Sequence, residues 1–199
     1  GKVSNQVKKW PSGLGSVAGF PDNIARHFES DSGFDWFDAG EGRLKINASD
    51  ERAPFVLAAT ALSLAKGSAV SIQTSIHKSS PNDVRVGFIV EGIQIGLRRQ
   101  RKGIDVYVRD QGEGSKPKSM VKINTGSKTA TLVVERDSRR DDRLNWFVRT
   151  DDKDRAGSVD ANMVERAATG VFAIAPKKES SVTTWISDLQ FRETKVDDE

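Results

Sequence analysis

The side chains best suited to holding a ligand lie at alternating positions between residues 84 and 110. They comprise one aromatic ring, three fork-shaped donors, one carboxylate and one amide: Arg85, Gln94, Arg98, Asp105, Tyr107 and Arg109. Successive side chains of a strand point to opposite faces, so three adjacent strands would gather this set on one polar face. An exposed ring among such donors is a credible carbohydrate platform. The same residue types are also ordinary cross-strand partners on a solvated sheet, and both interpretations stay open.

The tryptophans divide by their strand positions. Trp146 shares a face with Leu144 and Val148, and Trp185 is in register with Leu189, so both are predicted to lie in the core. Trp36 lies beside the turn at residues 38–42 and is the better candidate for an exposed, ligand-stacking ring.

An acidic segment is the candidate cation site. Residues 152–157 copy the first half of a calcium loop, D-x-D-x-x-G, but the third acidic position and the closing glutamate are missing. We therefore expect no EF-type site. A looser Ca²⁺ site formed by Asp151, Asp152 and Asp154 is one interpretation of the pattern, and a solvated turn is the other. No other cofactor is expected.

No residue set dictates a reaction. Glycoside hydrolysis needs two carboxylates about 5–10 Å apart across a bound sugar. Glu135 and Asp137 share strand parity, but Asp137 opens a charged turn. The chain contains no cysteine and no nucleophile-elbow pattern. We therefore expect no catalytic residues, and a sugar-active enzyme remains the alternative.

Composition narrows the choice of partner. The chain of 199 residues carries 31 basic and 28 acidic side chains, a net charge of +3, which does not suggest nucleic-acid binding. No apolar run approaches the ~20 residues that span a bilayer. The basic cluster at residues 98–102 could contact phosphates or an acidic polysaccharide, although charged hairpin tips also protect sheet edges from aggregation.

The elements that must position these side chains are mostly strands. Period-two runs separated by turn residues predict ten to thirteen strands, the spacing typical of a β-sandwich. Residues 53–66 fit either a helix or two short strands, and 161–168 could form a helical turn. We expect an irregular segment at 1–25, a single domain at 26–192 and a frayed acidic tail at 193–199.

The order of the predicted strands resembles the concanavalin A-like lectin and glucanase jelly roll. The resemblance covers residues 26–192, including TLVVERD at 131–137, NWFVRTDD at 145–152 and the closing ISDLQF at 186–191. It is closest to small secreted bacterial domains carried by larger proteins. The E-x-D-x-(x)-E strand of the family's glucanases and the metal loop of its legume lectins are absent, so neither function carries over.

The sequence thus predicts an all-β, two-sheet antiparallel jelly-roll sandwich with at most one or two short helices. The expected function is a non-catalytic carbohydrate- or cell-surface-binding module of a larger extracytoplasmic protein, with a polysaccharide or glycan as partner. A structural or protein-interaction domain without a small ligand is the third alternative.

Overall fold

The computed structural model describes residues 10–16, 35–38, 43–48, 55–56, 64–75, 84–110, 115–163, 170–174 and 182–193. These residues form strands and turns, and none of them is in a helix. The strands are β1 (Gly15–Ser16), β2 (Asp35–Asp38), β3 (Arg43–Ala48), β4 (Phe55–Val56), β5 (Ala69–Ser75), β6 (Arg85–Val90), β7 (Ile93–Gln100), β8 (Gly103–Arg109), β9 (Lys118–Asn124), β10 (Thr129–Arg136), β11 (Arg143–Arg149), β12 (Asp154–Asp160), β13 (Gly170–Ile174) and β14 (Val182–Arg192).

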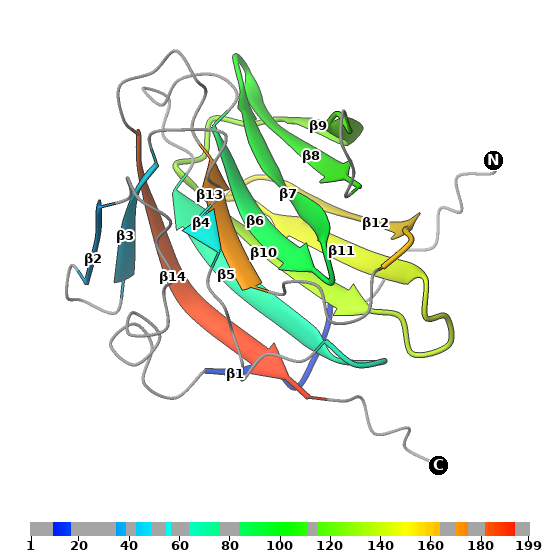
Figure 1. Cartoon of the computed structure of the whole chain (residues 1–199). Coiled ribbons are helices and arrows are strands. Elements are labelled where there is room, and N and C mark those ends of the chain that lie inside the picture. Colours follow the sequence, from blue (N-terminus) through cyan, green and yellow to red (C-terminus); the bar gives the residue numbers. More distant parts are fainter. Residues whose placement is uncertain are drawn as a thin grey trace.

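The strands form two antiparallel sheets (Figure 1). The eight-stranded sheet has the order β12-β11-β10-β5-β14-β3-β2, with β1 paired to the end of β14. The six-stranded sheet has the order β4-β13-β6-β7-β8-β9. The predicted all-β, two-sheet antiparallel sandwich is therefore confirmed.

One apolar core lies between the sheets. Alternate residues of β6, β7 and β8 face it, including Phe88, Ile95 and Val106, which are at most 1% exposed. The opposing sheet contributes Ile72 and Leu132, both fully buried. Burying such side chains stabilises a fold by about 1.5–3 kcal/mol each, so this layer fixes which face of each strand points outward.

A β-bulge in β14 changes which of its side chains face the core. The register to β5 shifts between Ser187 and Gln190, and Asp188 has a φ of 52°. An extra residue in one strand reverses the side-chain alternation beyond it. Ile186 and Leu189 are consequently both buried in the core, whereas Trp185 is only half-buried. The prediction that Trp185 shares the core face with Leu189 is wrong for this reason, while Trp146 lies in the core as predicted.

Strand β12 was not predicted. Its side chains are exposed or half-buried throughout, because it forms the edge of the eight-stranded sheet and lacks an apolar alternation. The predicted helical turn at 161–168 is not seen in its described part, Ala161–Met163, and the rest lies outside the described residues. Of the ambiguous segment 53–66, Phe55–Val56 is a strand and the described residues 64–66 are not helical. The tail at 194–199 and most of segment 1–25 also lie outside the described residues.

Candidate functional site

The predicted set on β6, β7 and β8 does converge. In the strand register, Arg85 lies opposite Arg98, which lies opposite Asp105. Arg98 Nη2 donates to Asp105 Oδ2 at 2.6 Å, and the Tyr107 hydroxyl donates to Gln94 Oε1 at 3.4 Å. The guanidinium carbons of Arg85 and Arg98 lie 5.8 and 5.9 Å from the Tyr107 ring centroid, within the range of cation–π attraction.

This group is not an exposed platform, however. Tyr107 and Asp105 are 0% exposed and Arg85 is 5% exposed. The Tyr107 ring belongs to a buried cluster with Ile89 and Phe172. The sheet makes room for these rings with Gly96, because a Cβ added at that position would come within 3.2 Å of the Phe172 ring. The predicted exposed ring of Tyr107 is therefore wrong, because the ring and its neighbours Asp105 and Arg85 are covered.

The remaining predicted ligand residues lie at the margin of that network or away from it. Gln94 and Arg109 face each other across β7 and β8 and are half-buried, so their contact with a ligand stays a prediction. Trp36 lies in β2, where its backbone pairs with Ile46 of β3. It therefore belongs to the other sheet and does not join the Tyr107 group.

Two of the three aspartates of the predicted calcium site are hydrogen-bonded within the protein. Asp152 Oδ1 accepts hydrogen bonds from Thr125 Oγ1 at 2.8 Å and Thr150 Oγ1 at 3.0 Å, and these bonds hold the pKa of its carboxyl below the usual value. Both oxygens of Asp154 accept from Arg149, at 2.9 and 3.0 Å, which also lowers the pKa of Asp154.

No group of three His, Cys, Asp or Glu side chains that could hold a metal occurs among the described residues, which include Asp151. A loose Ca²⁺ site at Asp151, Asp152 and Asp154 therefore stays a prediction, beside the solvated turn.

Glu135 and Asp137 do not form a free catalytic pair. Each accepts a hydrogen bond from Asn145 Nδ2 at 3.1 Å. Glu135 Oε2 also pairs with Arg192 Nη2 at 2.6 Å. Both carboxylates are therefore neutralised or hydrogen-bonded within a network on the outer face of the eight-stranded sheet.

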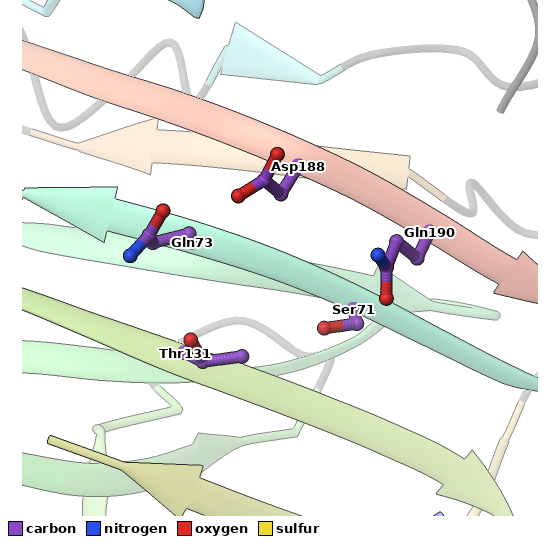
Figure 2. Close-up of a pocket in the computed structure, with 5 residues that line it drawn as sticks. All are labelled: Ser71, Gln73, Thr131, Asp188 and Gln190. Atoms are coloured by element: carbon purple, nitrogen blue, oxygen red, sulfur yellow. The ribbon is translucent and has the colours of Figure 1, made fainter. Parts of the chain in front are cut away.

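The same outer face carries a polar pocket of about 160 Å³ (Figure 2). Its lining comes from three neighbouring strands, β5, β10 and β14: Ser71, Gln73, Thr131, Asp188 and Gln190. These side chains alternate with buried core residues such as Ile72 and Leu132, and this alternation points them away from the inter-sheet core. The pocket therefore presents one carboxylate, two amides and two hydroxyls on an accessible sheet face.

The β14 bulge builds one wall of this pocket. Asp188 is exposed and adopts the left-handed backbone region, which aspartate tolerates better than most residues. Gln190, beyond the bulge, lies opposite Ser71, and Ser187, before it, lies opposite Gln73. The one extra residue of β14 thus places Asp188 between two in-register positions of the outer face. Backbone strain of this kind concentrates at functional sites.

The segment of residues 10–16 crosses the same face beside the pocket. Trp10 lies over β11, with its ring centroid 6.0 Å from that of Phe147 and 4.1 Å from the Arg149 guanidinium carbon. Arg192 Nη1 donates to the Ser12 carbonyl at 2.7 Å, and β1 pairs with the end of β14. This segment therefore borders the pocket at the Gln190 end.

Sequence reasoning missed the pocket. The alternation within residues 68–78 does identify Ser71 and Gln73 as one polar face, which is the available signal. Thr131, Asp188 and Gln190 are distant in sequence, and their positions depend on strand order and on a bulge that local pattern does not show.

Similarity to known proteins is confined to the fold. No protein-family model matches the chain, and no curated protein sequence does. Among solved structures, a bifunctional GH43-CE protein of Bacteroides eggerthii is similar over 81% of this chain and 22% of its own, with a TM-score of 0.61 and 13% identity. A protein of unknown function from Shewanella oneidensis MR-1 has a TM-score of 0.57 and 12% identity, covering 85% of this chain and 81% of its own.

A conserved carbohydrate esterase from the Shiga toxin-encoding bacteriophage phi24B is also similar. Its TM-score is 0.53 at 10% identity, and the match covers 92% of this chain and 100% of that one. At such identities the likeness shows the fold alone. The chain spans about a fifth of the length of the Bacteroides protein. The described residues contain no helix long and apolar enough to cross a membrane.

Proposed function

We propose that this chain is a non-catalytic carbohydrate-binding module with a concanavalin A-like jelly roll, and that it binds a neutral sugar in the Ser71–Gln190 pocket. The observation that carries the proposal is the pocket itself. Its amides and hydroxyls can each donate and accept hydrogen bonds, which matches the dual character of sugar hydroxyls. Asp188 adds an acceptor for charge-assisted bonds.

The charge of the pocket favours a neutral ligand. Asp188 is the one charged residue of the lining, and the nearby Arg192 is already paired with Glu135. A uronate or sulfate entering the pocket would meet a like charge without a counter-ion. A volume of about 160 Å³ also falls below the ~300 Å³ at which drug-sized pockets begin, so the site suits one sugar unit.

The pocket lining also argues against hydrolysis. Glycosidases need two carboxylates flanking the sugar, and the lining supplies one. The similarity to a GH43-CE protein, of which this chain spans 22%, supports a place for this module in a larger, sugar-directed protein, and we propose that this protein is extracytoplasmic.

A glycan array followed by calorimetry tests the proposal. Asp188→Asn keeps the shape of the side chain and the tolerated backbone conformation but removes the charge. Because hydrogen bonds to charged groups contribute about 1.5–3 kcal/mol, we expect a roughly 10- to 100-fold loss of affinity.

Gln100→Ala is the matched control, because Gln100 is half-buried on β7 of the other sheet; it should bind as the unaltered protein does. Absence of binding to every neutral glycan, or equal affinity of D188N and the unaltered protein, would overturn the proposal.

A further inference from the structure

A row of cations follows the free edge of the six-stranded sheet. We call it the basic edge; its members are Arg101, Lys102, Lys116, Lys118 and Lys122. All five side chains are exposed. Strand β9 is the outermost strand of its sheet (Figure 1), and no salt bridge to any of the five occurs within the part of the chain that the structure describes.

The turn and the strand are held together, so the cations of the turn lie beside the end of β9. The Thr125 amide donates to the Lys102 carbonyl at 3.1 Å, and Gly103 pairs with Asn124 at the end of the β8–β9 ladder. At about 3.3 Å per residue, Lys118 and Lys122 lie ~13 Å apart along β9. The turn cations continue the row beyond Asn124.

A bulge in β9 spreads the lysines around the edge. The register to β8 shifts between Val106 and Tyr107, so Lys122 lies on the outer face opposite Asp105 while Lys118 lies opposite Val108, on the other side of the sheet. A linear ligand laid along the edge could contact both lysines. It would also meet the backbone donors on the unpaired side of β9.

Among the described residues, two carboxylates lie close to the row. Asp105, opposite Lys122, is fully buried and already bonded to Arg98 and Ser119. The exposed Asp110 directly follows β8, and because Val108 pairs with Lys118 in the antiparallel ladder, Asp110 lies near the Lys116 end of the row. The row holds five of the chain's 31 basic side chains within two adjacent elements. Such a concentration attracts polyanions.

We propose that the basic edge binds a linear acidic polysaccharide, one with a repeating carboxylate or sulfate. This site is separate from the pocket and does not depend on its function. A single-stranded nucleic acid fits less well, because sites for it interleave aromatic rings with cations. The ring nearest the row in the described chain, Tyr107, is fully buried.

Retention on immobilised polygalacturonate and on heparin, at increasing salt, tests the proposal and separates a carboxylate from a sulfate ligand. Binding of a polyanion releases its counterions, so the logarithm of the affinity falls linearly with the logarithm of the salt concentration. With the slope of about −0.7 per contact that holds for single strands, a polysaccharide chain that contacts all five cations should give a slope near −3.5, or about a 100-fold loss of affinity between 50 and 200 mM salt. Lys118→Gln/Lys122→Gln should reduce the slope by roughly 1.4. Glutamine is used because a glutamate at position 122 would repel Asp105.

The matched control is Lys66→Gln/Arg139→Gln, which removes two exposed cations, one before β5 and one in the β10–β11 turn, and should leave retention unchanged. A K118Q/K122Q protein that is retained as strongly as the unaltered one would overturn the proposal. Equal losses in the control would show a response to net charge alone and would overturn it too. Tighter binding to single-stranded DNA than to either polysaccharide would overturn the ligand class. The D188N protein should be retained normally, which separates this test from that of the pocket.

Discussion

Replacing Asp105 with asparagine tests whether the outer face of the six-stranded sheet is structural or a ligand platform. The Asp105 side chain is 0% exposed and that of Arg98 19% exposed, with their charged atoms 2.6 Å apart. Removing one partner of a buried ion pair costs about 3–5 kcal/mol, whereas an exposed pair contributes about 0–1 kcal/mol. Arg98 is partly exposed and can be hydrated once its partner is gone. We therefore expect the free energy of unfolding to fall by an amount near the lower end of the 3–5 kcal/mol range, about 3 kcal/mol.

For a chain of this length, 1 kcal/mol corresponds to about 2–4 °C, so the Tm of D105N should fall by roughly 9 °C. Thermal melts and urea titrations with an unchanged m-value would measure the loss. A double-mutant cycle with Arg98→Met isolates the interaction energy of the pair. Ser119→Ala removes the hydroxyl that donates to the other oxygen of Asp105 and should cost only about 1 kcal/mol. A fall in Tm of less than about 3 °C would mean an exposed pair, and would refute the burial argument.

Two further predictions concern stability. The pKa values of Asp152, Asp154 and Asp160 are lowered, through hydrogen bonds from Thr125, Arg149 and Arg143 respectively. Their pKa values are lower in the folded state than in the unfolded state, so the stability they contribute is present above about pH 4 and is lost as the pH falls through the folded-state values. The Tm of Asp154→Asn should therefore lie below that of the unaltered protein at neutral pH and converge with it in acid. A Tm difference that stays constant at every pH would contradict this. Gly157→Ala should lower the free energy of unfolding by about 1–3 kcal/mol through overpacking, because the added methyl carbon would come within 2.4 Å of the buried Trp146 ring. An unchanged midpoint of urea unfolding would show that the ring can move aside.

The architecture was predictable wherever one face of a strand is apolar. Residues 84–110 alternate clearly, and β6, β7 and β8 follow that alternation. β12 escaped prediction because an edge strand needs little apolar surface, and Val159 alone packs against the core. The Trp185 error came from the bulge, which reverses the alternation without a clear local signal.

The candidate sites depend on how the strands pack against one another, which the sequence of each strand alone does not show. The alternation correctly grouped Arg98, Asp105 and Tyr107, but whether a polar face meets water depends on what packs over it. A fully buried tyrosine and aspartate could not be inferred from a sequence of alternating polar residues. The pocket likewise required the order β10-β5-β14, which brings together residues 71, 131 and 188.

The place of β14 in the middle of the eight-stranded sheet has a consequence for synthesis. It is the last strand of the chain, yet it separates β5 from β3 and also pairs with β1. Until residue 192 has left the ribosome, this sheet lacks its centre, and its earlier strands must wait with open hydrogen-bonding edges. Sheets closed by such distant pairings form slowly and expose aggregation-prone surfaces meanwhile. A chain that lacks β14 should therefore be insoluble rather than only slightly destabilised.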